Sequence, residues 1–362
     1  MIEHAYIHIP FCKRKCHYCS FISGLDIKNK RKYLDALLQE IKIKYKGEKL
    51  KTIYFGGGTP TLLDVEELKT VLSMFSYNQE TEITIEANPE TITLEKLTKI
   101  KEAGFNRISL GLQTFNNDIL KSIGRNHSEN TIYCAIENIK TAGFSNISID
   151  LIYGLPNQTM ELWKIDLEKA VSLNIQHISS YGLKIEDDSF FGKNPPKNLP
   201  DDEIQASMFT ELCKYLKENN FSHYEVSNFA KKGFESKHNC AYWKNKNYYG
   251  FGLNASGYEN DIRYKNLCDF EKYIKTPLEH EDEEFLSTKE TMENEIFLGL
   301  RLKDGINITS LEKKYKINFE SKYKKIIDKY TKLQLLKIEN NNCYLTENGF
   351  LLSNEIMSEF ID

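Results

Sequence analysis

The sequence predicts an α/β protein whose main part is an open, partial (β/α)6 barrel of parallel strands, followed by a smaller, mainly helical, winged-helix-like C-terminal domain. Six short β-rich runs alternate strictly with helical segments up to about residue 230, and such alternation is typical of a parallel sheet with right-handed crossovers. Six units are fewer than the eight that close a full barrel of this type. A flat, doubly wound sheet is the alternative.

The predicted strands are compact runs enriched in Ile, Tyr, Thr or Phe, the composition of buried parallel strands. In chain order they cover residues 5–10, 52–55, 82–87, 107–113, 147–152 and 177–183.

The helices between them each show one apolar face. Apolar residues recur at three- and four-residue steps at positions 34, 37, 38, 41 and 45, and again at positions 97, 100 and 103, which predicts amphipathic helices. Thr93 is a candidate N-cap for the second of these helices, and Gly104 is expected to end it. A sixth stripe of this kind runs over residues 204–216.

Composition divides the chain into three predicted parts. Residues 1–230 form the barrel. Residues 231–287 are aromatic and glycine-rich with little periodicity. Helical periods return at residue 288, and a β-like pair at 335–338 and 343–345 precedes a final helix over about 347–360. Residues 288–362 are therefore expected to form the C-terminal domain.

Bulk properties indicate an ordinary water-soluble chain. Of its 362 residues, 40% are hydrophobic and 28% charged, with a formal net charge of −4, so no field of one sign favours nucleic acid or an anionic membrane. The N-terminus lacks the pattern of a secretory signal, and no apolar run is long enough for a membrane span. We therefore expect a cytoplasmic protein with reduced thiols.

Three of the eight cysteines crowd into one segment, Cys12-Lys-Arg-Lys-Cys16-His-Tyr-Cys19, directly after the first predicted strand. Structural zinc takes four protein ligands, usually in two separated pairs. Three ligands in one loop instead favour an iron–sulfur cluster of four irons with one iron free of protein ligands. The alternative is a zinc knuckle completed by His17 or Cys240.

Polar residues follow the next strands at the same end of the predicted sheet. The run Gly56-Gly57-Gly58-Thr59-Pro60 follows the second strand, and Glu86, Gln113 and Asp150 lie at or near the ends of the third, fourth and fifth. Glycines let a ligand approach the backbone, and polar residues at this end of barrel strands tend to be functional. Each alone is as readily a capping or loop residue. Together they predict one ligand site.

The chain resembles the radical S-adenosylmethionine (SAM) family. The resemblance rests on His8-Ile9-Pro10-Phe11-Cys12 with Cys16 and Cys19, on the glycine–threonine–proline run, and on three later segments. These segments are Ile85-Glu86-Ala87-Asn88-Pro89, Leu110-Gly111-Leu112-Gln113-Thr114 and Asp150-Leu151-Ile152-Tyr153-Gly154-Leu155-Pro156. The resemblance covers nearly the whole chain and is greatest to the branch that contains oxygen-independent coproporphyrinogen III oxidase and the haem chaperone HemW.

This resemblance implies a [4Fe-4S] cluster on Cys12, Cys16 and Cys19. It also implies SAM contacts from Tyr6, Tyr18, Gly57, Gly58, Thr59, Glu86, Gln113, Arg125 and Asp150. For most of these the residue chemistry agrees, since Arg125, for example, can donate two hydrogen bonds to a carboxylate.

Three features favour the haem chaperones over the oxidase. Phe21 stands where the oxidase usually has a fourth cysteine, and the segment before Cys12 is short. The run His238-Asn-Cys-Ala-Tyr242-Trp243 resembles the haem-chaperone motif. A neutral imidazole is a good axial ligand of haem iron, and Tyr242 and Trp243 offer flat faces for a porphyrin.

The alternative for this motif is an aromatic core segment in which His238 makes a structural hydrogen bond. The sequence also departs from the family at Ser256, where a histidine is usual. Ser256 cannot ligate iron as imidazole would.

The resulting hypothesis is a haem chaperone with a cluster, SAM and haem as cofactors and a haem-acceptor protein, a respiratory haemoprotein, as partner. Peripheral membrane contact and a homodimer remain open. The rival is oxidative decarboxylation of coproporphyrinogen III. A DNA-binding regulator, suggested by nine lysines in residues 313–337, is the weakest alternative, because such runs usually form solvated helix faces.

Overall fold

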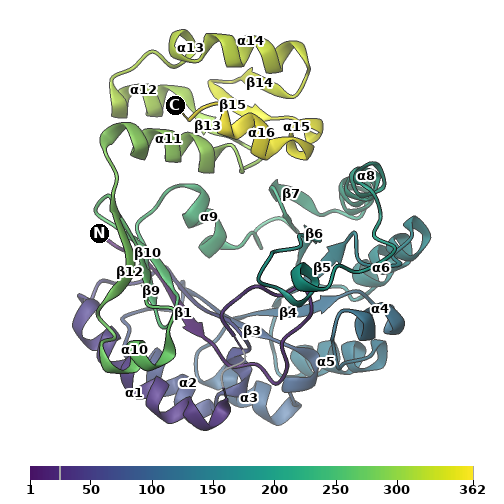
Figure 1. The fold of residues 1–362 in the computed structure, drawn as a ribbon, viewed down its shortest axis with the longest axis vertical. Coiled ribbons are helices and arrows are strands. Elements are labelled where there is room, and N and C mark those ends of the chain that lie inside the picture. Colours follow the sequence, from purple (N-terminus) through teal and green to yellow (C-terminus); the bar gives the residue numbers. More distant parts are fainter. Residues whose placement is uncertain (24–25, 362) are drawn as a thin grey trace.

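The computed structural model describes residues 1–23 and 26–361. Figure 1 shows a large sheet with covering helices and, apart from it, a smaller C-terminal group of helices. Six of the strands pair in parallel, each with its neighbour along the chain. They are β1 (His4–Ile9), β2 (Thr52–Gly57), β3 (Glu82–Ala87), β4 (Arg107–Gln113), β5 (Asn146–Tyr153) and β6 (His177–Gly182).

The complete sheet has nine strands in the order β7-β8-β6-β5-β4-β3-β2-β1-β9. Strand β9 (Tyr249–Phe251) pairs in parallel with β1, while β8 (Asn228–Ala230) and β7 (Ser222–Glu225) extend the other edge in antiparallel pairing. The outer strands β7 and β9 do not pair with each other, so the sheet stays open. The predicted partial barrel is confirmed, and the flat doubly wound alternative is not needed.

Helices cover the outer side of this sheet (Figure 1). Those of the barrel are α1 (Lys30–Lys44), α2 (Val65–Leu72), α3 (Leu94–Glu102), α4 (Asn117–Ser122), α5 (Glu129–Thr141), α6 (Met160–Ser172), α7 (Phe190–Lys193) and α8 (Asp202–Glu218). Three short 3-10 turns accompany them: η1 (Ile27–Asn29), η2 (Pro60–Leu62) and η3 (Pro89–Thr91). As predicted, the Thr93 side chain caps α3 by accepting from the Lys96 N–H, and Gly104, with φ 111°, follows its end.

The two faces of the sheet differ sharply in polarity, because successive side chains on a strand point to opposite faces. The outer face is apolar and buried beneath the helices, with Ile7, Phe55, Ile85, Leu110 and Ile149 at 0% exposure. The inner face is polar, and its strands carry alternating polar residues in register: Tyr6, Tyr54, Thr84, Arg107 and Asn146 in one row and Glu86, Ser109, Ser148 and His177 in the next. The interior of the barrel is therefore built to hold polar groups.

The aromatic segment contributes to the main sheet through β9 and also forms its own antiparallel sheet, in the order β10-β11-β12. Its other elements are α9 (Lys237–Trp243), β10 (Ser256–Glu259), β11 (Ile262–Asn266), α10 (Phe270–Lys275) and β12 (His280–Phe285).

The C-terminal region is mostly helical, with a small sheet in the order β13-β15-β14. Its elements are α11 (Thr288–Gly299), β13 (Ile306–Asn307), α12 (Ile308–Tyr315), α13 (Phe319–Lys322), α14 (Lys324–Lys332), β14 (Leu336–Glu339), β15 (Asn342–Leu345), α15 (Glu347–Leu351) and α16 (Ser353–Ser358). The predicted hairpin is present as β14 and β15, whereas the predicted final helix is divided at Leu352. The exact domain boundaries at residues 230 and 287 stay predictions.

No helix within the described ranges is long and apolar enough to cross a membrane.

Candidate functional site

The three clustered cysteines occupy the loop that leaves β1 at its C-terminal end. The Cys12 Sγ lies 3.6 Å from the Thr59 hydroxyl, and the Cys16 Sγ accepts a hydrogen bond from Arg125 Nη1 at 3.4 Å. The Cys19 N–H donates to the Cys16 carbonyl, which turns the loop back on itself. All three thiols are free and partly buried.

The thiols lie close enough to influence one another. Burial raises the pKa of Cys12 and of Cys19, and the neighbouring Cys16 thiolate raises both further. Within residues 1–23 and 26–361, no three His, Cys, Asp or Glu side chains are already closed around a metal position. The donors nevertheless suit an iron–sulfur cluster, since three soft thiolates come from one loop.

Neither proposed fourth ligand of a zinc knuckle is directed at these thiols. The His17 Nδ1 lies 2.9 Å from the Ser122 carbonyl, and its ring packs on Phe190 at 4.5 Å. Cys240 lies on α9, at the other end of the strands. This arrangement favours the cluster over zinc.

The glycine run passes directly beside the cysteine loop. A Cβ atom on Gly57, which has φ 107°, would lie 2.5 Å from the His8 ring, and one on Gly58 would lie 2.6 Å from the Phe11 carbonyl oxygen. Only glycine fits at these two positions. Thr59, 2% exposed, accepts a hydrogen bond from Asn88 Nδ2 at 2.9 Å, so the run is fixed from both sides.

Glu86 and Asp150 project from neighbouring parts of the inner face. Glu86 accepts hydrogen bonds from the Tyr54 hydroxyl at 2.8 Å and the Gly57 N–H at 3.1 Å. Burial raises the pKa of Glu86 to about 7, and the nearby charge of Asp150 adds to this rise. Burial also raises the pKa of Asp150, which accepts from the Ser109 hydroxyl at 3.3 Å. These carboxylates can receive ammonium and hydroxyl donors of a ligand.

Arg125 joins the cysteine loop to β4. Its Nη2 donates to the Gly111 carbonyl and to Gln113 Oε1, each at 2.5 Å. Gln113 has φ 69° at an irregularity in the pairing of β4 with β5, and this turns its side chain toward Arg125. The buried Nε of Arg125 has no hydrogen-bond partner among the described residues. A free guanidinium donor at this place suits a ligand carboxylate.

Two tyrosines complete the predicted SAM set. The Tyr6 hydroxyl lies 3.1 Å from His8 Nδ1, and its ring stacks on Tyr54 at 6.1 Å between centroids. Tyr18 packs against the apolar cluster that includes Ile119 and Ile123. Burial raises the pKa of both tyrosines, so both remain neutral donors. The predicted SAM residues thus lie on the inner face or near the C-terminal ends of the strands, and their contact with SAM stays a prediction.

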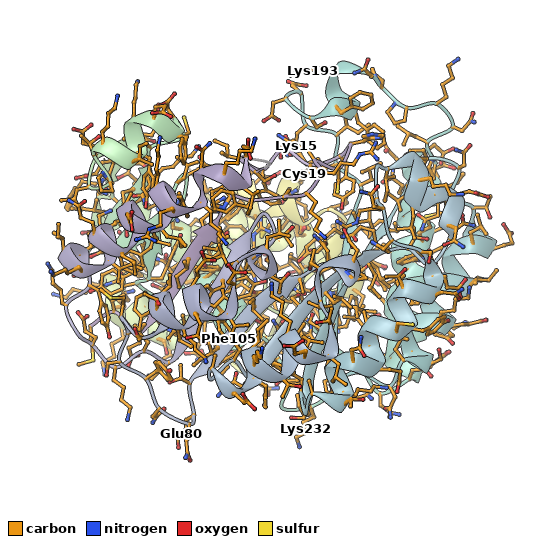
Figure 2. The ribbon with its side chains drawn as sticks, turned by 90° about the horizontal axis from the view of Figure 1, so that it is seen from below. Lys15, Cys19, Glu80, Phe105, Lys193 and Lys232 are labelled. Carbon is orange, nitrogen blue, oxygen red and sulfur yellow. The ribbon has the colours of Figure 1, made fainter. Side chains whose placement is uncertain are left out.

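The haem-motif helix α9 lies at the opposite end of the strands. Its first N–H groups, those of Lys237 and His238, donate to the Glu82 carboxylate at the start of β3. In Figure 2, Lys15 and Cys19 lie in the upper part of the molecule, and Glu80, just ahead of β3, lies at its lower edge. The Lys237 Nζ donates to the Glu80 carbonyl at 3.2 Å. The cysteine loop and the haem motif therefore lie at opposite ends of the strands.

His238 is 1% exposed, and both of its ring nitrogens are engaged. Its Nδ1 lies 2.7 Å from the Thr52 hydroxyl, its Nε2 lies 2.7 Å from the Tyr242 hydroxyl, and its ring stacks on Tyr54 at 5.0 Å. Burial holds the pKa of His238 well below its usual range, so the ring is neutral. The Trp243 ring lies 5.0 Å from the Arg301 guanidinium.

Haem ligation by His238 stays a prediction, and the structure adds a condition to it. A ring nitrogen must exchange its present hydrogen bond for iron, and α9 must admit the porphyrin. Ser256, where the family usually has a histidine, lies exposed on β10.

Several contact residues were missed by sequence reasoning. Asn88 holds Thr59, Tyr54 holds Glu86, and Thr52 and Glu82 hold α9. The signal was available in the strands, where polar residues alternate with apolar ones at positions 52 and 54 and at positions 82, 84 and 86. Such alternation marks a polar face.

Comparison with known proteins bears on this arrangement. The family model of the Radical SAM superfamily matches residues 6–170, and that of the HemN C-terminal domain matches residues 286–352. The haem chaperone HemW of Lactococcus lactis is 42% identical over 99% of this chain and 97% of its own length. HemW of Bacillus subtilis is 37% identical, with 99% of each chain covered.

The chain belongs to the HemW family of radical SAM proteins.

This chain also shares its fold with a solved structure, the coproporphyrinogen III oxidase HemN of Escherichia coli. That structure matches with a TM-score of 0.87 over 99% of this chain and 89% of HemN, at 24% sequence identity. At this identity the match shows the fold alone, including the partial barrel and the separate C-terminal region.

Proposed function

We propose that this protein is a haem chaperone, which binds haem and passes it to an acceptor protein. The observation that carries the proposal is the similarity to haem chaperones over the full length of the chain, at 42% and 37% identity. Phe21 supports it, because this side chain is 63% exposed beside the cysteine loop at the place of the oxidase's fourth cysteine.

The cofactor set of the proposal is a [4Fe-4S] cluster on Cys12, Cys16 and Cys19 with SAM beside it. When bound, such a cluster offers one open iron that can chelate the amino and carboxylate groups of SAM and supply one electron. In this chain, Arg125 would orient the SAM carboxylate, and the backbone of Gly57 and Gly58, which only glycine lets pass against His8 and Phe11, would contact the ligand. Glu86 and Asp150 would accept hydrogen bonds from its amino and ribose groups.

The haem site of the proposal is α9, with His238 as iron ligand and Tyr242 and Trp243 against the porphyrin. The neutral state of the buried His238 ring suits this role, because iron takes an unprotonated nitrogen. The acceptor is proposed to be a respiratory haemoprotein.

An anaerobic haem titration of the cluster-loaded protein tests this proposal. We expect saturation near one haem per chain in the wild type and its loss in His238→Ala. His280→Ala is the matched control, because His280 is a partly exposed histidine outside the motif. Haem binding that does not saturate and is equal in all three proteins would refute the haem site.

A second assay separates the chaperone from the oxidase. The protein is incubated anaerobically with coproporphyrinogen III, SAM and a chemical reductant, and we expect no protoporphyrinogen. Its formation would assign the chain to oxidative decarboxylation instead.

A further inference from the structure

Helix α9 keeps His238 inaccessible in this structure. The side chain is 1% exposed, and both of its ring nitrogens are hydrogen-bonded to other side chains. A porphyrin cannot reach either nitrogen while the helix keeps this position. The contacts that hold α9 therefore control access to the proposed haem site.

The first turn of α9 is held by the main sheet. The Glu82 carboxylate accepts from the N–H groups of Lys237 and His238, each at 3.1 Å, and the Tyr224 hydroxyl accepts from the Ser236 N–H at 3.1 Å. A carboxylate at a helix N-terminus is favoured by both the free N–H groups and the helix dipole. This end of α9 is firmly anchored.

The last residue of α9 is held by the C-terminal region. The guanidinium of Arg301 lies 5.0 Å from the Trp243 ring centre and 5.3 Å from that of Phe297, so it contacts both aromatic rings. Arg301 follows α11 and is fixed to the edge strand β7. Its carbonyl accepts from the Val226 N–H at 2.9 Å, and the Lys303 N–H donates to the Tyr224 carbonyl at 3.0 Å.

Buried polar atoms meet at this junction. Glu225 Oε2, Asn228 Oδ1, Trp243 Nε1 and Arg301 Nε make no hydrogen bond of good geometry among the residues that the structure describes. Burial raises the pKa of Glu225, but Asn228, Trp243 and the Arg301 charge all lower it, so these groups face its carboxylate. This end of α9 is therefore held by side-chain contacts with Arg301 and Glu225, without the hydrogen bonds from backbone N–H groups to a carboxylate that anchor the first turn.

We propose that Arg301 is a latch that holds α9 closed over His238, and that haem enters when the C-terminal region releases Trp243. The proposal rests on the proposed function for the identity of the ligand. Because the first turn stays anchored on Glu82, only the last turn of α9 unwinds, beginning at Trp243. Tyr242, next to Trp243, then leaves the His238 Nε2 and frees it for iron.

The energetic consequence follows from the population of the open form. Apparent haem affinity is reduced by the fraction of molecules that are competent to bind. Removing a contact worth about 1 kcal/mol raises that fraction roughly fivefold while the open form stays the minor one. The latch therefore predicts faster haem uptake when Arg301 is altered.

Acrylamide quenching of tryptophan fluorescence tests the latch without haem. The chain has two tryptophans, and Trp163 is 0% exposed, so quenching reports on Trp243. The variant Arg301→Met keeps the length of the side chain and removes its charge. We expect its quenching constant to rise severalfold, with faster amide exchange at residues 240–243 than at 237–239.

Arg263→Met is the matched control, because Arg263 also stacks on an aromatic ring, that of Tyr258, but on β11. We expect it to behave as wild type. Should Arg301→Met fail to fold, Arg301→Lys serves instead, because it keeps the charge with fewer contacts. We expect its quenching constant to lie between those of the wild type and Arg301→Met. Quenching and exchange that stay at the wild-type level in a folded Arg301→Met protein would overturn the latch.

The haem association rate, measured by stopped flow, links the latch to the proposed site. We expect it to rise about fivefold in Arg301→Met and to stay unchanged in Arg263→Met. Greater quenching with no specific haem uptake in any variant would keep the latch and refute the haem site. Unaltered quenching with normal haem uptake would refute the latch and leave the proposed function standing.

Discussion

The Nε2 of His238 and the hydroxyl of Tyr242 lie 2.7 Å apart, one turn of α9 from each other. The nitrogen proposed to bind iron therefore already has a partner from its own motif. Tyr242→Phe removes this hydrogen bond and keeps the ring. Since such a bond contributes about 1 kcal/mol, we expect haem affinity to rise roughly fivefold.

Equilibrium titration monitored by absorbance measures this change. Tyr248→Phe is the control, because the Tyr248 ring packs on Tyr242 at 4.5 Å without contributing to the His238 contact. A loss of affinity in Tyr242→Phe would mean that the hydroxyl itself contacts haem.

Replacing Cys12, Cys16 and Cys19 together by serine should abolish cluster binding, because these thiolates are the proposed iron ligands. Iron and sulfide analysis after anaerobic reconstitution measures the loss. Cys240→Ser should retain full iron and sulfide, since Cys240 lies at the other end of the strands. A zinc content that depends on Cys240 would restore the zinc-knuckle alternative.

Glu86→Gln should weaken SAM binding by about tenfold or more, because the carboxylate is replaced by an amide that cannot accept at both oxygens. Glu86 also receives the Tyr54 hydroxyl and the Gly57 N–H, so the glycine run should loosen as well. Equilibrium dialysis with labelled SAM measures the effect. Glu95→Gln, on the exposed face of α3, controls for net charge. Equal binding in the two variants would remove Glu86 from the site.

Because His223 lies partly buried between the barrel and the C-terminal region, we expect the protein to lose stability at acidic pH. Its ring stacks on Phe229 at 4.3 Å and meets Phe350 at 4.9 Å, and burial lowers the pKa of His223 to about 4. As pH falls from 6.5 toward 4, the unfolded chain takes up a proton that the folded protein refuses, so stability falls. Between pH 7 and pH 5 this linkage costs about 2 kcal/mol.

Urea unfolding at the two pH values measures this cost in the wild type and in His223→Gln. Between pH 7 and pH 5, the fall in the free energy of unfolding should be about 2 kcal/mol smaller in His223→Gln than in the wild type. At pH 7 the variant itself should be less stable than the wild type. An identical loss in both proteins would assign the acid sensitivity to other histidines.

The strands of the barrel could be predicted because each carries its signal locally. The predicted ranges 82–87 and 107–113 coincide with β3 and β4, since composition and alternation within the strand decide them. The additions at the sheet edges could not be predicted in this way. Strand β9 has three residues, and it is a strand because it pairs with β1, more than 230 positions earlier in the chain.

In the candidate site, too, residues with a local sequence signal could be predicted and long-range contacts could not. Residues at strand ends were predictable, because parallel strands bring their C-terminal ends to one edge. The surroundings of His238 were not, because its partners Thr52 and Glu82 come from the barrel more than 150 positions away. The sequence could place an imidazole beside aromatic rings, but not state which side chains already occupy its nitrogens.

The ring of Tyr54 lies between the two proposed sites. It stacks on His238 at 5.0 Å, and its hydroxyl donates to Glu86 at 2.8 Å. The cysteine loop and α9 lie at opposite ends of the strands, yet a single aromatic side chain spans the distance from the proposed iron ligand to a proposed SAM contact. A porphyrin carried at α9 would therefore rest one side chain away from the SAM residues, and Tyr54 would couple the occupancy of one site to the other.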